Sequence, residues 1–169
     1  MDITVPTKNG NLLDKYTKHT DNKYKENGRP FISFPININN IPADTKSLAF
    51  ALTDLDSIPV CGFEWIHWIG ANIDPRIKQI PENAAKENSV EFNHGYNSLA
   101  GSLIDMKSDA MSLGYVGPTP PNKKHNYTFT VYALDKKLEL TDGFWYNEMI
   151  HKMDGHIIEK EILNLPVKN

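Results

Sequence analysis

A proline-rich segment followed directly by a strand pattern constrains the fold of this chain most strongly. Its three prolines fall within four positions: Pro118, Pro120 and Pro121. Each proline fixes φ, removes a backbone donor and restricts the residue before it, so the segment 117–124 cannot form regular secondary structure. From His125 to residue 134 the residues alternate between two types, with Tyr127, Phe129, Val131 and Ala133 on one side and mostly polar residues between them. This alternation predicts a strand. A stiff loop therefore delivers His125 and Tyr127 to one face of a strand, although a proline-rich turn with two hydrogen-bonded polar residues would give the same pattern.

Two aspartates follow a second predicted strand. Residues 47–53 form a near-continuous apolar run, which is typical of a strand buried on both faces. The run ends at Asp54-Leu55-Asp56, where core packing does not require two carboxylates. If the strand geometry continues, Asp54 and Asp56 share a face. The alternative interpretation is a turn in which the aspartates hydrogen-bond their own backbone.

A histidine lies within the most apolar stretch of the chain, residues 62–73. Strand alternation predicts two faces here: Trp65, His67 and Ile69 on one, and Ile66, Trp68 and Gly70 on the other. A buried imidazole needs partners for its nitrogens, and a lone histidine among aromatic residues is usually structural. His67 is not alone, because the aspartate pair precedes it and His125 with Tyr127 lies in the later strand.

Composition limits the class of protein. The 169 residues predict one domain, 1–169, and the net charge of −3 argues against a nucleic-acid partner, which would need a basic surface. Cys61 is the only cysteine, which fits a reducing compartment. The N-terminus does not resemble a secretory signal, and no apolar run approaches the ~20 residues of a membrane helix. We therefore expect a cytoplasmic protein without integral membrane association.

These residues together carry a resemblance to a known family. The motifs are Asp-x-Asp followed by Pro, then Trp-x-His-Trp, then Gly-Pro-x-Pro-Pro-x-x-x-His-x-Tyr-x-Phe-x-x-Tyr-Ala-Leu. The chain resembles the phosphatidylethanolamine-binding protein family, most closely its bacterial Raf-kinase-inhibitor-like branch. The resemblance implies a mainly β fold: an antiparallel β-sandwich with a few short helices, chiefly near the C-terminus, and a small anion pocket at one end.

The resemblance also implies a set of ligand-binding residues: Asp54, Asp56, His67, Pro118, Pro120, Pro121, His125 and Tyr127. Two positions depart from the family pattern near this set. Leu55 replaces a proline between the aspartates, and Asn126 replaces an arginine between the later histidine and tyrosine. Whether Leu55 and Asn126 alter the pocket stays open.

The rest of the chain is consistent with this architecture. The strands around Phe50, Ile66 and Val131 are expected to be central, and residues 31–38 to form another strand. Residues 93–112 are expected to form a long loop near the pocket, since long loops in compact domains are often functional. A helix is predicted from about residue 142 to 153, and the segment 157–165 stays open between a short helix and an extended tail.

Three functions remain open. The first is a non-enzymatic binding protein for a phosphate-like group, as in a phospholipid headgroup, a phosphorylated metabolite or a phosphopeptide. Histidine and tyrosine side chains can donate to phosphate oxygens, and Lys123 and Lys124 would add a favourable field. The second is a metal-dependent hydrolase with His67, His125 and Asp54 as ligands.

The third function is an inhibitor or regulator of a kinase or protease that acts through its surface, which the resemblance implies for relatives. We expect no enzyme activity, because the chain has neither a Gly-x-Ser-x-Gly nucleophile motif nor a glycine-rich phosphate loop. No cofactor and no metal are therefore predicted, and a homodimer stays open.

The aspartates beside the two histidines suggest a pH-dependent mechanism. Carboxylates favour the imidazolium form, whereas burial opposes it. A bound anion adds support for the imidazolium, so we expect anion affinity to fall as the pH rises.

Overall fold

The computed structural model describes residues 1–87 and 89–169. Its strands are β1 (Asp2–Thr4), β2 (Thr7–Lys8), β3 (Asn11–Leu12), β4 (Lys25–Glu26), β5 (Arg29–Pro30), β6 (Ile36–Asn39), β7 (Ser47–Asp54), β8 (Trp65–Ile73), β9 (Gln79–Ile80), β10 (Asn93–His94), β11 (His125–Leu134) and β12 (Ile157–Val167). Its α-helices are α1 (Ile58–Cys61), α2 (Ala84–Glu87) and α3 (Tyr146–Met153). The predicted mainly β fold with a few short helices is confirmed, and its longest helix, α3, lies near the C-terminus.

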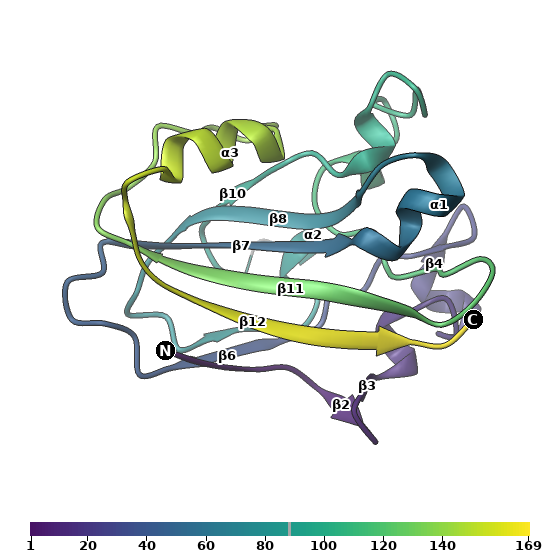
Figure 1. Ribbon diagram of the computed structural model, residues 1–169. Helices are drawn as coiled ribbons and strands as arrows, with labels where there is room; N and C mark the ends of the chain where they lie inside the picture. Colours follow the sequence, from purple (N-terminus) through teal and green to yellow (C-terminus); the bar gives the residue numbers. More distant parts are fainter. Residues whose placement is uncertain (88) are drawn as a thin grey trace.

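The main sheet has the strand order β10-β8-β7-β11-β12, and every neighbouring pair is antiparallel (Figure 1). The apolar runs predicted to be central form β7, β8 and β11, the three inner strands. An inner strand has neighbours on both edges, so its hydrogen-bonding groups are satisfied and its side chains can be buried on both faces. All eight residues of β7 are buried accordingly.

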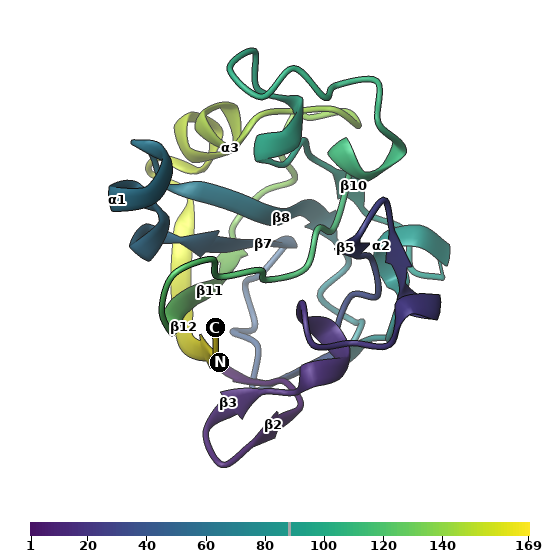
Figure 2. The same ribbon diagram turned by 90° about the vertical axis from the view of Figure 1, so that its right-hand side faces the viewer.

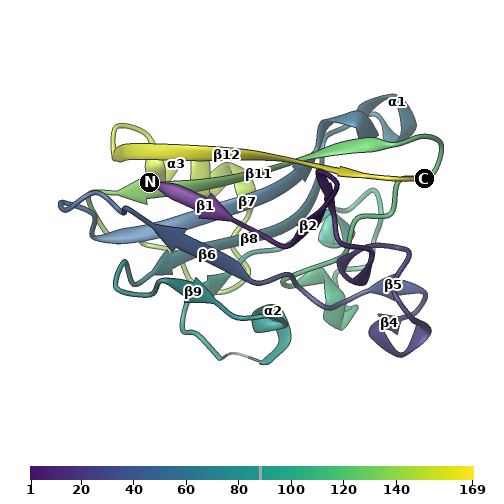
Figure 3. The ribbon, with the colours of Figure 1, turned by 90° about the horizontal axis from the view of Figure 1, so that it is seen from below.

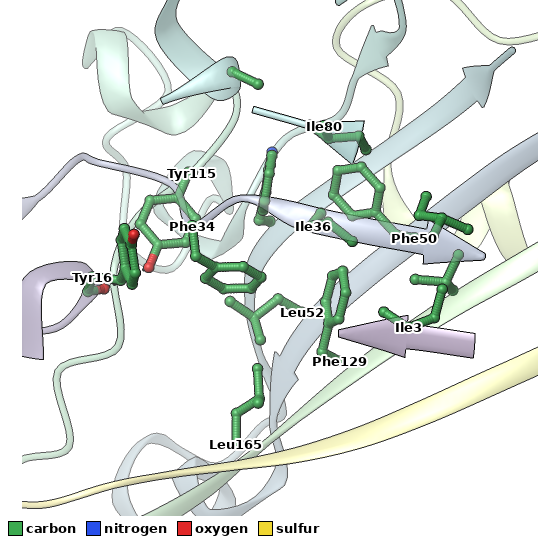
Figure 4. Packing of buried hydrophobic residues seen from close by; sticks show 14 of the residues in the cluster. Ile3, Tyr16, Phe34, Ile36, Phe50, Leu52, Ile80, Tyr115, Phe129 and Leu165 are labelled. Atoms are coloured by element: carbon green, nitrogen blue, oxygen red, sulfur yellow. Dashed lines mark hydrogen bonds between the residues drawn. The ribbon is translucent and has the colours of Figure 1, made fainter. Parts of the chain in front are cut away.

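A smaller antiparallel sheet, β1-β6-β9, packs against one face of the main sheet and lies in front of it in Figure 3. Side chains of both sheets share one core, in which Ile3, Ile36 and Ile80 meet Phe50 and Phe129 (Figure 4). Two shorter hairpins, β2-β3 and β4-β5, complete the sheets in the described residues.

The opposite face of the main sheet is covered by α3, whose Met149 and Met153 pack on small and branched side chains of β7 and β8. The predicted helix began at residue 142, but α3 begins at Tyr146. Gly143 explains the difference, because its φ of +84° lies in the left-handed region that a right-handed helix cannot contain.

Two further segments differ from the prediction. The strand expected over 31–38 is limited to β6, from Ile36, since the preceding Pro35 cannot donate to a ladder. The C-terminal segment 157–165, left open between helix and extended tail, is the strand β12, which pairs with β11 along its length. Leu163 and Leu165 on β12 then face the main core. No helix among the described residues is long and apolar enough to cross a membrane.

Candidate functional site

The three inner strands have polar residues at their ends, and these ends lie together at one end of the main sheet. β7 ends at Asp54, β8 begins at Trp65 and β11 begins at His125. Asp54 pairs with Tyr127 on one side and with Trp65 on the other, so residues distant in sequence become neighbours. Figure 2 shows this end of the molecule, with α1 and the proline-rich loop around it. A cavity of about 290 Å³ opens there.

Five of the eight predicted site residues line this cavity: Asp54, His67, Pro121, His125 and Tyr127. The side chains of Asp54, His67, His125 and Tyr127 are all at least nine-tenths buried. The sequence therefore predicted which polar side chains converge, including two histidines from different strands.

Asp56, Pro118 and Pro120 are not among the residues that line the cavity, so their ligand-binding role stays a prediction. The strand geometry ends at Asp54, because a 3-10 turn runs from Leu55 to Ser57. The Asp56 carboxylate consequently accepts a hydrogen bond from the Asn126 backbone N–H (2.9 Å).

Pro118 and Pro120, the two buried prolines of the loop, anchor this loop to the N-terminal region. Their carbonyl oxygens accept hydrogen bonds from Lys18: Pro118 O from the Lys18 backbone N–H (2.8 Å) and Pro120 O from its Nζ (2.7 Å). Lys18 thus fastens the N-terminal region to the loop that carries Thr119 and Pro121 into the cavity wall.

A β-bulge places His67. Leu52 pairs with Trp68 and Thr53 pairs with Ile66, which leaves His67 as the extra residue of β8. The alternation predicted for this strand therefore fails after His67. Trp68 joins the main core, and Ile69 joins Ile66 on the opposite face under α3.

Val116 fixes the ring of His67 and its tautomer. The Val116 N–H donates to His67 O (3.0 Å), and His67 Nδ1 lies 2.7 Å from Val116 O. Because a carbonyl only accepts, Nδ1 carries a proton, and Nε2 is left for a ligand. Burial lowers the pKa of His67 to about 4, outweighing the Val116 hydrogen bond and Asp54, so this ring is neutral near pH 7.

His125 has partners for both ring nitrogens. Nδ1 lies 2.7 Å from Asp54 Oδ2, and Nε2 lies 2.9 Å from Asn122 Oδ1. Both ring nitrogens of His125 therefore face oxygen acceptors, and Nδ1 carries a proton because a carboxylate only accepts. The second oxygen, Asp54 Oδ1, is buried and has no hydrogen-bond partner in the described part of the chain.

Tyr127 supplies a hydroxyl to the same cavity. Its ring lies against His67, with the ring centroids 5.1 Å apart. Burial, followed by the Asp54 carboxylate, raises the pKa of Tyr127 well above its ordinary value. The hydroxyl therefore stays protonated and can donate to a ligand.

Several cavity residues were not predicted: Arg29, Ser57, Val60, Cys61, Trp65, Leu99, Ile104, Met106, Val116, Gly117 and Thr119. The expectation that the loop 93–112 lies near the pocket agrees with the positions of Leu99, Ile104 and Met106. Arg29 carried no sequence signal, because only the tertiary fold brings it to the cavity, whereas Asn122 reaches His125 from three residues earlier in the chain. Lys123 and Lys124 are exposed and lie outside the cavity wall.

The hydrogen bonds of the ring nitrogens concern the second open function, a metal-dependent hydrolase with His67, His125 and Asp54 as ligands. Each histidine uses Nδ1 for a protein acceptor. Among the residues that the structure describes, no group of three or more His, Cys, Asp or Glu side chains could hold a metal ion.

Comparison with known proteins places the chain among relatives of one family. The model of the family described as "Phosphatidylethanolamine-binding protein" matches residues 4–168. The chain is 47% identical over 154 residues to the uncharacterized protein YxkA of Bacillus subtilis, covering 91% of this chain and 92% of the relative. It is 33% identical over 129 residues to a UPF0098 protein of Chlamydia trachomatis, covering 75% and 76%.

Two solved structures have the same fold. A phosphatidylethanolamine-binding protein homologue of Chlamydia trachomatis, CT736, matches with a TM-score of 0.75 and 28% identity, covering 94% of this chain and 90% of that one. YbcL of E. coli, described as a member of the mammalian family of such proteins, matches with a TM-score of 0.76 and 19% identity, covering 99% and 97%. At that identity, the second match concerns the fold alone.

Proposed function

Because this chain belongs to the phosphatidylethanolamine-binding protein family, we propose that its cavity binds a small phosphate-like anion and that the protein is a binding protein, not an enzyme. One observation carries the proposal: the buried side chains of His67, His125 and Tyr127 converge in one cavity. Each can present an N–H or O–H to an anionic oxygen, and hydrogen bonds to charged groups are stronger than neutral ones. We infer that the two sheets act as a β-sandwich that holds this cavity at one end.

The charges near the two histidines favour uptake of a proton with the anion, since Arg29, the cation that also lines the cavity, already pairs with Asp109. The Asp54–His125 pair has no net charge when His125 is an imidazolium, and His67 is neutral in the free protein. An incoming anion favours the charged form of His67, so His67 takes up a proton and Nε2 becomes a donor. Asp54 has a supporting role in this scheme, because it orients His125 and holds its charge.

Calorimetric titration of methyl phosphate at pH 6 tests the proposal. His125→Ala removes a charge-assisted hydrogen bond worth about 1.5–3 kcal/mol, so we expect affinity to fall about tenfold or more. Tyr127→Phe keeps the buried ring and removes only the hydroxyl, so it should weaken binding with little effect on folding. His151→Ala, on the exposed side of α3, is the matched control.

The outcome that overturns the proposal is equally direct. If methyl phosphate does not bind the wild-type protein, or binds His125→Ala and Tyr127→Phe as tightly as the wild type, the cavity is not an anion site. Near-ultraviolet circular dichroism of each variant separates a lost contact from a lost fold.

Regulation of a kinase or protease through the surface stays a prediction, as do a homodimer and a cytoplasmic location. A pull-down from the source cell, sedimentation of the purified protein and cell fractionation would test the three in turn.

A further inference from the structure

The cavity has two chemically different sides. Asp54, His67, His125 and Tyr127 form the polar side. The apolar side consists of Trp65, Leu99, Ile104, Met106 and Val116. These apolar residues belong to a small hydrophobic cluster that is separate from the two larger cores of the protein. The cluster borders the anion-binding groups in the cavity wall, where Val116 contacts His67 directly.

A single loop, residues 101–109, supplies Ile104 and Met106 to the apolar side. Within it, Met106 N–H donates to Leu99 O (3.1 Å), which folds the loop back over the preceding 3-10 turn. Arg29 on β5, which also lines the cavity, holds the loop: its Nη2 donates to Met106 Sδ (3.2 Å), and its Nη1 lies 3.6 Å from Asp109 Oδ2. The position of Met106 is thus fixed by contacts from two other parts of the chain.

Some apolar side chains of the cluster remain partly exposed where they line the cavity. Trp65, Ile104 and Met106 are half-buried members of their cluster and line the cavity, whereas Leu103 on the same loop is 85% exposed and lies outside the lining. A bare oxyanion would satisfy only the polar side and leave this apolar surface in contact with water. Small-molecule sites typically combine such apolar walls with a few convergent polar groups.

We propose that the ligand is a soluble amphiphile in which the anionic group is joined to a compact apolar group, of the size of an aromatic ring or a short branched alkyl chain. The anionic group meets His67, His125 and Tyr127, and the apolar group packs against Trp65, Ile104 and Met106. This inference rests on the proposed function and adds the chemical class of the ligand.

Methyl phosphate and phenyl phosphate test this class, because they share the charged group and differ in the apolar one. Removing a ring from water gains about 25 cal/mol per Å² of apolar surface, of which binding retains a part, so we expect phenyl phosphate to bind at least about tenfold more tightly. The double variant Ile104→Ala/Met106→Ala should remove most of that advantage and leave methyl phosphate binding nearly unchanged. Leu103→Ala is the matched control on the same loop and should change neither affinity.

The results separate this inference from the proposed function. If neither ester binds, the proposed function fails. If methyl phosphate binds but phenyl phosphate binds no more tightly, or if the double variant weakens both equally, the amphiphile is ruled out while the anion site stands. Vesicles of an anionic phospholipid form a second arm, and binding to vesicles without binding to phenyl phosphate would also overturn the proposal.

Discussion

At the residue scale, the two histidines of the cavity have different surroundings, although both lie on strands of the main sheet. His67 is neutral because burial outweighs its carbonyl and carboxylate neighbours, whereas His125 lies between two acceptors, one of them a carboxylate. For His67 both expected effects are present: Asp54 favours the imidazolium and burial opposes it, and burial is the larger effect. Asp54 bonds His125 directly and reaches His67 only through its charge.

The pH dependence of binding follows from His67. Its free-site pKa of about 4 rises when an anion binds, so affinity is greatest below pH 4, falls above it, and levels off beyond the bound-site pKa. Asp54, His125 and Tyr127 face the ring, and Asp54 supports the charged form. Sulfate is the probe, since phosphate ionises near pH ~6 itself. Calorimetry in buffers of different ionisation enthalpy should show proton uptake, and equal affinity at pH 5.5 and 8 would contradict this mechanism.

Asn122 competes with the ligand for His125. A ligand oxygen that accepts from Nε2 must displace Asn122 Oδ1, which costs a hydrogen bond of about 0.5–1.5 kcal/mol. We therefore expect Asn122→Ala to tighten methyl phosphate binding by about threefold or more, as measured by calorimetry. Asn126→Ala is the control, because Asn126 is exposed and its side chain bonds Asn164. Weaker binding by Asn122→Ala would mean that this side chain belongs to the site.

At the scale of elements, the turn between β7 and β8 joins the ends of these two strands next to the cavity. Ser57 Oγ accepts from the Trp65 N–H (2.9 Å) and lies 2.5 Å from Asp54 O and 2.8 Å from Phe63 O, both acceptors. One hydroxyl therefore joins the last residue of β7 to the first residue of β8. Leu55, which replaces the family's proline, is 52% exposed, so the turn does not depend on its side chain.

Ser57→Ala should loosen this turn. The Trp65 N–H and the carbonyl oxygens lose their partner, which typically costs about 1–3 kcal/mol of stability where such groups are buried. Urea unfolding measures the loss, and anion affinity should fall with it, because Asp54 and Trp65 both line the cavity. Ser102→Ala, in an exposed loop, is the control. A variant as stable as the wild type would show that water replaces the hydroxyl.

At the scale of the whole molecule, Phe34 joins the segments that enclose the main core. Its ring is fully buried and makes edge-to-face contacts with Tyr16, Trp68, Tyr115 and Phe129, at centroid distances of 5.3–6.1 Å (Figure 4). These partners come from the N-terminal region, from β8 and β11, and from the loop before the prolines. Phe34 itself lies in irregular structure, just before β6.

Phe34→Ala should therefore destabilise the entire fold. A buried phenylalanine replaced by alanine typically costs about 3–5 kcal/mol, and we expect one cooperative unfolding transition with a lower midpoint. Guanidinium unfolding followed by tryptophan fluorescence measures it. Phe63→Ala, at a half-buried position, should cost clearly less. An equal loss in both variants would contradict the central role of Phe34.

Local sequence patterns determined the strands that form the centre of this protein. Alternation in 125–134 and the apolar run before Asp54 depend on side-chain period and burial, which neighbouring residues specify. The prolines excluded regular structure just before His125. The family motifs added that Asp54, His67, His125 and Tyr127 converge.

The tertiary structure alone decided how those residues act. The bulge that sets His67, the Val116 carbonyl that fixes its tautomer, and the burial that keeps it neutral all come from segments far away in the chain. The same holds for the Arg29 contact that positions the apolar loop and for the pairing of β12 with β11. A periodic pattern specifies which side chains become buried, but hydrogen bonds and local dielectric depend on which distant groups meet, and only the packed fold determines that.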